Sequence, residues 1–552
     1  MNLVKDKWIP VKRADGTPDI IAPWEIGASD NPVVDIAAPR PDFRGALYQF
    51  LIGLVQTAFA PEDDVEWEEK WKKIPDCEEL QKSFERFSEA FELTAESGPA
   101  FMQDFDMPEN AKNEDVYSLF IDAPGENTMK GNKDLFVKRG TISGLCNPCF
   151  ATALHTLQIN ASSGGAGHRT CLRGGGPLTT LIIQDVNNNI WSMIWLNILT
   201  LDKKFQLQEM ITPNTFPWMG PVRDSEPIEE SREEKTTRLK SQKNKTPKER
   251  NQIKRDRETA KLIYPNQVDE LQQYWNTPRR IRLTGKTEKG ICNCCGKEAL
   301  IIKSYLSKNY GCNYSDTWQH SLSPYYCTKE TNGMLSLNAF KGKEGGFCYS
   351  DWLSLTIGGD DGELAAAVVT SFNESKFCRI GKVKQIRIWC FGYDMDKDKA
   401  RCWYEQTMPL ILLPKAKQPE FLSIIRPIIL AADDAAQIAV NQIKAAWFSR
   451  PKDTKVDTRF ISSSFWETTE STFYSTAEQI RSAIESDKPT DVIRLEWRNT
   501  IISAAEKIFD RFALNATDEP RNMKRIALAS KSLSIILRSE KSKSINALKE
   551  AA

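Results

Sequence analysis

Two cysteine pairs carry the clearest chemistry in this sequence. Each pair has the spacing Cys-x-x-Cys, and the four members are Cys146, Cys149, Cys292 and Cys295. Each pair can supply two thiolates to a tetrahedral ion, and two pairs complete the closed four-thiolate set typical of structural zinc. Because such a set leaves no open coordination position, we expect a structural and not a catalytic zinc site. Unligated buried thiols are the alternative, and three further cysteines could substitute as ligands: Cys294, Cys312 and Cys327.

A glycine-rich run, SSGGAGHR at 162–169, follows the first pair. Glycine this dense loses too much backbone entropy to lie in a helix or a central strand. Its bare backbone can instead form an anion-binding concavity or approach a flat ligand closely. Arg169 and Arg173 flank the run, and Lys138 and Arg139 precede it. A bare backbone among cations suggests contact with a phosphate chain or a nucleic-acid groove. A tight structural turn is the alternative, and the run matches neither the P-loop nor the dinucleotide fingerprint.

Composition narrows the class of protein. The 552 residues carry 74 basic and 74 acidic side chains, so the net charge is zero. A protein that holds nucleic acid alone is usually more basic, and zero charge better suits one subunit of an assembly. Three histidines are few for a histidine-based catalytic site, and thirteen cysteines, an odd number, favour thiols and metal over disulfides. The N-terminus lacks an apolar signal core and no apolar run approaches a membrane span, so we expect a cytoplasmic protein with no membrane contact.

Local patterns predict the elements that must position these residues. Residues 2–11 favour a strand with a hairpin partner at 19–21, and 40–59 favours a helix with one buried face. Further predictions are a polar helix at 76–93, buried strands at 177–185 and 279–283, and a buried apolar segment, helical or strand then helix, at 189–201. The segment 384–413 predicts a hairpin whose charged tip is Asp394–Lys399.

Two regions differ from the rest in composition. Residues 224–262 form a charged insertion, acidic and then basic, which is either an arm that touches nucleic acid or a solvated surface segment. Beyond Pro414 the pattern is helical throughout, with predicted helices at 420–449, 464–487, 490–515 and 520–550. Such helices most simply form an antiparallel four-helix bundle. We therefore predict an α+β fold, with a mixed α/β domain at 1–414 and the bundle at 415–552.

Several segments, taken together and in order, resemble the CasA family, the large subunit of the type I-E CRISPR surveillance complex Cascade. These segments are MNLVKDKWIPV, RPDFRGALYQFLIGLVQT, LCNPC, GGAGHRTCLRGGGPLTT, CNCCG and HSLSP. The resemblance implies a large mixed α/β domain followed by a four-helix bundle. It also implies a subunit without catalytic activity that recognises the protospacer-adjacent motif in double-stranded DNA. Such a subunit starts strand separation, guides the displaced strand and provides a docking surface for the Cas helicase-nuclease.

The resemblance also implies roles for particular residues. The glycine loop of the family, which contacts DNA, falls on Ser163, Gly164, Gly165, Ala166 and Gly167. The family loop that contacts other Cascade subunits and the 5′ end of the CRISPR RNA falls on Phe136, Val137 and Lys138, where lysine replaces the asparagine of the family. The cysteine pairs match the pairs of the family.

Two more DNA contacts follow from the resemblance. The lysine finger falls on Lys308, with Asn309 beside it. The glutamine wedge lies on a hairpin tip after Gly-Tyr, and here Gly392-Tyr393 is followed by a tip without glutamine, so that Asp396 and Lys397 take its place. Minor-groove readout is coarse because the acceptor pattern is degenerate, so a reader of this kind should tolerate several motifs.

Two other functions remain open at this point. One is a zinc-dependent nucleic-acid hydrolase that uses Cys149, His155 or His168. The other is a purely architectural subunit, in which the basic insertion and the bundle bind only partner proteins.

Overall fold

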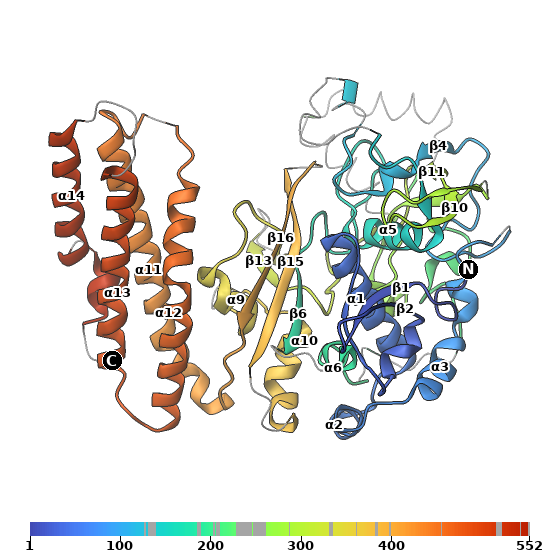
Figure 1. Cartoon of the computed structure of the whole chain (residues 1–552), viewed down its shortest axis with the longest axis horizontal. Helices are drawn as coiled ribbons and strands as arrows, with labels where there is room; N and C mark the ends of the chain where they lie inside the picture. Colours follow the sequence, from blue (N-terminus) through green and yellow to red (C-terminus); the bar gives the residue numbers. More distant parts are fainter. Residues whose placement is uncertain are drawn as a thin grey trace. The chain divides into compact units, whose positions relative to one another are not determined.

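A computed structural model gives the fold of the chain (Figure 1). It describes residues 1–95, 97–125, 129–130, 140–184, 189–201, 205, 210–227, 246, 261–285, 287–329, 335–359, 362–380, 385–396, 399–453, 455–514, 522–540 and 542–549. These residues divide into two compact units, each built from separate segments. The first comprises 1–344, 357–384 and 389–405, and the second comprises 345–356, 385–388 and 406–552.

The first unit begins with a small antiparallel sheet and a buried helix. Strand β1 (Ile9–Arg13) lies between β2 (Pro18–Ile21) and β3 (Val33–Ile36), with Ile9 opposite Ile21. Helix α1 (Pro41–Ala58) follows, with proline at its start and Asp42 in its first turn, where both are favoured. The predicted hairpin is confirmed, although its first strand begins at Ile9 and not at residue 2. The predicted helix is also confirmed, but it is buried on all sides and not on one face, since every residue of α1 except Pro41 and Arg44 is buried. The five apolar residues expected on the buried face of the helix are all buried: Phe43, Leu47, Leu51, Leu54 and Val55.

An aromatic cluster forms the core around α1. The Phe50 ring meets the rings of Trp8, Phe91, Phe101 and Trp275 edge-on, with centroids 5.3 to 5.9 Å apart. Edge-to-face pairs of this kind stabilise a core beyond the area they bury. Helix α1 packs against α3 (Cys77–Glu85), α5 (Asn147–Asn160) and α6 (Ile190–Trp195). The same unit also contains α2 (Asp64–Lys72) and α10 (Ala367–Ser371).

Short strands, most of them antiparallel, carry the loops that matter for function. One sheet has the order β5 (Leu145–Cys146), β10 (Glu298–Ile302), β9 (Thr287–Ile291), and a second has the order β4 (Lys112–Asp115), β11 (Ser304–Lys308), β8 (Arg280–Leu283). A third has the order β16 (Lys399–Pro409), β15 (Ile386–Asp396), β6 (Thr179–Gln184). Two pairs complete the set, β7 (Leu262–Ile263) with β12 (Asn313–Tyr314), and β13 (Tyr325–Lys329) with β14 (Leu335–Ala339). The predicted hairpin and the strands near 177–185 and 279–283 are therefore confirmed.

The second unit is helical. Its elements are α9 (Trp352–Thr356), α11 (Gln418–Trp447), α12 (Arg459–Glu485), α13 (Asp491–Phe509), α14 (Met523–Arg538) and α15 (Lys543–Ala547). Helix α11 packs against α12, α13, α14 and α15, and the long helices lie alongside one another in Figure 1. None of the helices that the structure describes is long and apolar enough to span a bilayer.

Three predicted helix boundaries are wrong. The helix expected at 76–93 ends at Glu85, because a 3-10 turn over Ser88–Phe91 directs Phe91 into the aromatic core. Helix α12 begins at Arg459 and not at 464, because the Asp457 carboxylate accepts the Arg459 amide.

The last predicted helix, 520–550, is two helices. The break lies between Arg538 and Lys543, where the Ser539 and Ser542 hydroxyls donate to the Ile536 carbonyl at 3.2 and 2.8 Å. Serine side chains that bond nearby carbonyls compete with a continuing helix. The apolar segment 189–201, predicted as a helix or as a strand followed by a helix, contains the short helix α6.

Candidate functional site

The four predicted ligand cysteines converge in the first unit. The sulfur atoms of Cys146, Cys149, Cys292 and Cys295 all lie within 4.8 Å of one another, and the Cys146 and Cys295 sulfurs are 3.7 Å apart. A tetrahedral ion with metal–sulfur distances of about 2.3 Å requires sulfur–sulfur separations of about 3.8 Å. The spacing of this cysteine cluster therefore suits a four-thiolate metal site.

Backbone geometry brings the two pairs together. Cys146 ends β5 and Cys149 lies in the first turn of α5, whereas Cys292 and Cys295 lie in the turn between β9 and β10. The Asn293 side-chain oxygen accepts hydrogen bonds from the Ser143 and Gly144 backbone amides, both at 2.9 Å. The Asn293 backbone amide donates to the Gly144 carbonyl. The cysteine cluster thus joins two segments that are far apart in the sequence.

The thiols of the cluster influence one another's protonation. Hydrogen bonding with the Cys146 thiol raises the pKa of Cys149, and hydrogen bonding from the same thiol lowers the pKa of Cys292. The protein alone therefore favours a mixture of thiol and thiolate at this site. A divalent cation would stabilise the thiolate form of all four, because thiolates are the form that binds metal.

Two of the possible substitute ligands lie elsewhere. Cys312 is buried with Leu172, Ile263 and Trp318, and Cys327 lies against Gly362. Cys294 lies beside the cluster, and hydrogen bonding with Cys149 lowers its pKa, but the mutually close set is the predicted one.

The glycine loop is held by the residues that follow β11. The Asn309 side-chain amide donates to the Ala166 carbonyl at 2.8 Å, and the Tyr310 amide donates to the Gly167 carbonyl at 2.8 Å. Gly167 has φ +77°, and a Cβ there would lie 2.9 Å from Asn309 and from the Tyr310 ring. Only glycine fits this position. The structure therefore brings the predicted loop and the predicted Lys308–Asn309 pair together.

The second glycine segment connects this loop to the hairpin. A Cβ on Gly175 would lie 3.0 Å from the Ser162 Cα atom, and a Cβ on Gly176 would lie 2.4 Å from the Met395 side chain. Residues from three distant parts of the chain thus lie against one another, and some of them, such as Gly176, are buried. We call this set of residues the glycine surface and define it as Ser163–Gly167, Gly175, Gly176, Lys308, Asn309, Met395 and Asp396.

Ser163 to Ala166, Asn309 and Asp396 are exposed on this surface. Lys308 is half-buried, and its amino group lies 3.3 Å from the Asn110 side-chain oxygen and 3.8 Å from a Glu226 carboxylate oxygen. Lys397, and also Phe136, Val137 and Lys138, lie outside the described residues, as does most of the charged insertion.

The strand that leads into the hairpin tip is firmly anchored. The Tyr393 hydroxyl donates to the Asp42 carboxylate of α1 at 2.5 Å, and Arg40 pairs with the same carboxylate at 2.9 Å. The buried Asp394 carboxylate accepts two hydrogen bonds from Arg401 of β16, at 2.8 and 2.6 Å. Such charge-assisted bonds hold Met395 and Asp396 in a defined position.

The expectation of surrounding arginines holds only in part. Arg173 is a core residue: its guanidinium donates to the side chains of Thr179, Ser323 and Gln49 and to the Ile159 carbonyl, at 2.9 to 3.2 Å. Its burial is possible because four oxygens satisfy these donors. Arg169 bonds to Ser225 and lies over the Tyr310 ring. Neither arginine is a bare cation beside the loop.

Two cations near the loop had not been predicted. Arg279 donates to the Ser162 carbonyl at 2.6 Å, and burial lowers its pKa to about 10. The exposed Lys341 lies 4.0 Å from the position of a Cβ on Gly174. Gly175 and Gly176 were equally missed as members of the surface. Their sequence signal, the GGGP run, was visible, but its packing against Ser162 and Met395 was not.

The histidines of the hydrolase alternative lie apart from the cysteine cluster. His155 is buried against Phe50 and Trp275, and burial lowers its pKa to about 3. His168 lies in the glycine loop, and its amide donates to the Gly165 carbonyl. Among the described residues, neither belongs to the group that could hold a metal.

The sequence model of the family described as CRISPR-associated protein Cse1 matches residues 2–243 and 246–508, which is most of the chain. The chain belongs to the Cse1 family. One solved structure bears both names, CasA and Cse1, so the resemblance to the CasA family is confirmed.

Solved structures have the same fold as this Cse1 chain. CasA (Cse1) from Thermus thermophilus is 16% identical with a TM-score of 0.65, over 97% of this chain and 99% of that chain. Cse1 from Thermobifida fusca is 14% identical with a TM-score of 0.69, over 99% and 98%. A chain of a CRISPR RNA-guided surveillance complex is 15% identical with a TM-score of 0.61, over 98% and 99%. At these identities the likeness concerns the fold.

Proposed function

We propose that this chain is the large, non-catalytic subunit of a type I-E CRISPR RNA-guided surveillance complex. Membership of the Cse1 family supports the proposal, as does the similar fold of a chain from a CRISPR RNA-guided surveillance complex. Its partners are then the other Cascade subunits, the CRISPR RNA and double-stranded target DNA. The family contact that falls on Phe136, Val137 and Lys138 would face the guide and the neighbouring subunits.

We assign recognition of the protospacer-adjacent motif to the glycine surface, and this is the observation that carries the proposal. Exposed loop backbone and the side chains of Lys308 and Asn309 lie together there. Bare backbone can enter a narrow groove, and a lysine can donate to the base acceptors at its floor. Because Lys308 also pairs with Glu226, DNA would have to compete with that carboxylate.

We assign the start of strand separation to the hairpin tip at Asp396 and Lys397. Insertion of side chains into a base stack costs a few kcal/mol, and pairing of guide with target offsets that cost. A hairpin that separates base pairs must keep its position against the DNA. The hydrogen bonds of Tyr393 to Asp42 and of Arg401 to Asp394, which anchor the strand before the tip, support this assignment. In the same scheme the opened DNA is passed to the Cas helicase-nuclease, which docks on this subunit.

We propose structural zinc for the cysteine cluster. The cysteine spacing fits a tetrahedral four-thiolate ion, with Cys146, Cys149, Cys292 and Cys295 as ligands. The ion would fasten the strand before α5 to the turn between β9 and β10. We likewise propose that 415–552 is an antiparallel four-helix bundle, which the packing of α11 against α12, α13 and α14 supports.

The decisive experiment compares the reconstituted complex with and without this subunit. Each preparation is mixed with duplexes that carry a guide-matched target beside randomised bases, and the bound fraction is sequenced. We expect enrichment of a short motif that disappears when the subunit is omitted. If omission lowered binding equally for all sequences, the subunit would be a non-specific DNA clamp.

Gly165 tests the assignment of the loop. A Cβ at Gly165 would meet no atom within 4 Å, so the fold tolerates a side chain there. We expect Gly165→Phe to abolish motif-dependent binding without changing assembly of the complex or its melting temperature, because the ring would fill the space needed by the groove. Normal binding of motif-bearing DNA by this variant would show that the loop is not the reader.

A further inference from the structure

A pocket in the helical unit has an excess of positive charge. It has a volume of about 400 Å³ and is lined by Arg498, Asn499, Ile502, Ser503, Glu506, Arg538 and Lys549. Three of these side chains are cationic and one is a carboxylate, which leaves two positive charges uncompensated among the lining residues. The lining comes from α13, the end of α14 and the residue two beyond α15.

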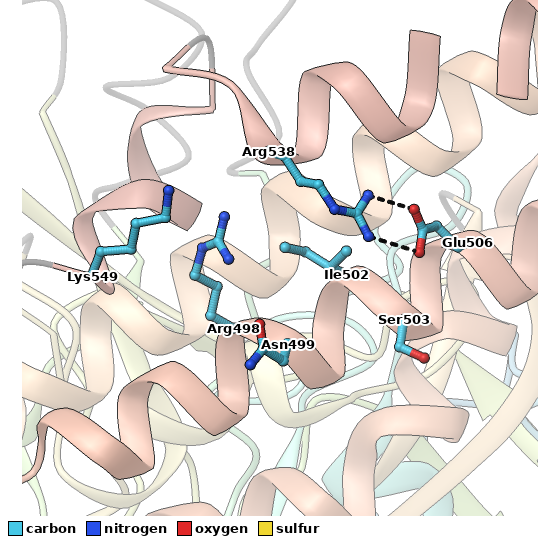
Figure 2. A pocket seen from close by; sticks show the side chains of 7 residues that line it. All are labelled: Arg498, Asn499, Ile502, Ser503, Glu506, Arg538 and Lys549. Carbon is cyan, nitrogen blue, oxygen red and sulfur yellow. Dashed lines mark hydrogen bonds and ion pairs between the residues drawn. The ribbon is translucent and has the colours of Figure 1, made fainter. Parts of the chain in front are cut away.

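The carboxylate is already engaged. Arg538 and Glu506 form a two-pronged ion pair, at 2.6 Å and 3.2 Å, and Arg538 also donates to the Ser534 hydroxyl at 2.8 Å. Figure 2 shows Arg538 turned toward Glu506, while the heads of Arg498 and Lys549 end in the same space. Glu506 therefore compensates the charge of Arg538, and among the described lining residues no second carboxylate compensates Arg498 and Lys549.

Arg498 is the unusual member of the pocket. Its side chain is only 8% exposed, and its Nε atom has no hydrogen-bond partner among the described residues. One terminal nitrogen donates to the Asn546 side chain over a long 3.4 Å. Burial, and secondarily the Arg538 charge, lower the pKa of Arg498. Buried arginine donors are normally satisfied, so the unpartnered Nε atom of a residue that lines a polar pocket points to a missing acceptor.

We propose that this pocket binds a phosphate group. A phosphate dianion would balance the two uncompensated charges, and its oxygens could accept from the Arg498 guanidinium and the Lys549 amino group. Planar guanidinium forks match phosphate oxygens well, and Ser503 and Asn499 offer further donors. The pocket is larger than the ion, so a phosphate that belongs to a longer molecule would also fit. This inference does not depend on the proposed function of the glycine surface.

The test is calorimetric titration of the full-length chain with inorganic phosphate at constant ionic strength. We expect one saturable site in the unmodified protein, and a loss of affinity of about tenfold or more in Arg498→Gln and in Lys549→Gln, the usual effect of removing a charge-assisted hydrogen bond. Glu506→Gln should bind phosphate more tightly, because it releases Arg538 to the pocket. Lys531→Gln, which removes an exposed lysine from α14, is the matched control and should bind unchanged.

Absence of a saturable site, or equal losses in Lys531→Gln and Lys549→Gln, would overturn the proposal. If Arg498→Gln fails to fold, Lys549→Gln decides the question, since Lys549 is exposed. A second titration distinguishes the source of the phosphate. An oligothymidylate without terminal phosphates that displaces inorganic phosphate identifies a nucleic-acid backbone as ligand. Failure to displace identifies a free phosphate or phosphate monoester, and either result supports the pocket.

Discussion

Gly165 and Gly167 lie two residues apart in one loop and are under different constraints. Gly167 has a left-handed φ and touches Asn309 and Tyr310, whereas Gly165 is surrounded by open space. Gly167 is needed for folding of the loop, whereas Gly165 is free for contact with a ligand. At the residue scale, substitutions can therefore separate the shape of the loop from its use.

Lys308 and Asn309 can be separated in the same way. Lys308→Ala should weaken binding of motif-bearing duplex by about tenfold and reduce its salt dependence, because it removes a charged contact. Glu226→Gln should strengthen that binding, since it releases the lysine. Asn309→Ala should weaken DNA binding indirectly, by loosening the glycine loop, because the Asn309 side-chain amide donates to the Ala166 carbonyl. Binding measured in the reconstituted complex at several salt concentrations checks this. A loss in Asn309→Ala alone would assign the DNA contact to Asn309.

The buried Lys376 side chain should make the stability of the protein depend on pH. The side chain is fully buried, its amino group donates to the Ile198 carbonyl and lies 5.1 Å from the Trp67 ring centre, and burial lowers its pKa from 10.5 to about 7. At pH values between these two pKa values, the unfolded chain binds more protons at Lys376 than the folded chain does. The free energy of unfolding should therefore rise with pH across that range.

Replacement of Lys376 should remove this contribution. Lys376→Met should be more stable at pH 7, by on the order of a few kcal/mol, and the advantage should shrink as the pH approaches 10.5. Urea unfolding at several pH values measures the difference between variant and parent, and the exposed Lys5→Met is the control. A constant difference at every pH would contradict the prediction.

At the scale of elements, the cysteine cluster brings together two segments that are far apart in the sequence. The sheet order β5-β10-β9 places one pair beside the other, and Asn293 fastens the two turns even without an ion. A metal would add a restraint to the strand pairing and the Asn293 hydrogen bonds that already connect these segments. It would lie close to the first turn of α5, the helix that leads into the glycine loop.

Removal of the metal should loosen this region. We expect about one zinc ion per chain by mass spectrometry. A chelator or Cys292→Ser should lower the melting temperature, with a loss of several kcal/mol in stability. Because protons compete for thiolates, zinc should also be released as the pH falls. Cys402→Ser, which alters an exposed cysteine, is the control. Protein purified with zinc present that contained no metal would refute the site.

At the scale of the whole molecule, charge limits what the free chain can do. Basic and acidic residues are equal in number, at 74 each. Affinity for DNA that rests on many phosphate contacts requires an excess of positive charge. Recognition by this chain should therefore depend on the assembled complex, with local cations contributing at particular points.

The isolated chain should bind non-specific duplex weakly. The slope of log affinity against log salt should correspond to only about two or three phosphate contacts, because each contact contributes close to one to the slope. Fluorescence anisotropy at increasing salt concentration measures it. A steep slope for the free chain would mean that it grips DNA by itself, through the charged insertion or another basic segment.

The sequence by itself determined the features that depend on local spacing. The helix at α1, the hairpin of β15 and β16, and the two Cys-x-x-Cys pairs follow from patterns within a few residues, because periodicity and turn chemistry act over that range. Family membership also followed from segments that could be read in order along the chain. Helix ends were less certain, as the break between α14 and α15 shows, because serine hydroxyls there compete with the backbone.

Only the tertiary structure decided which distant residues meet. Arg173 stands beside the glycine run in sequence, yet it is buried and satisfied by Gln49, Thr179 and Ser323. Asn309 and Met395 are far from that region in sequence, yet Asn309 lies against Gly167 of the run and Met395 lies against Gly176 of the second glycine segment. Nothing local encodes such contacts, because they arise from the packing of whole elements against a common core. The positive pocket at Arg498 has the same origin, since its charges come from helices whose proximity no local pattern predicts.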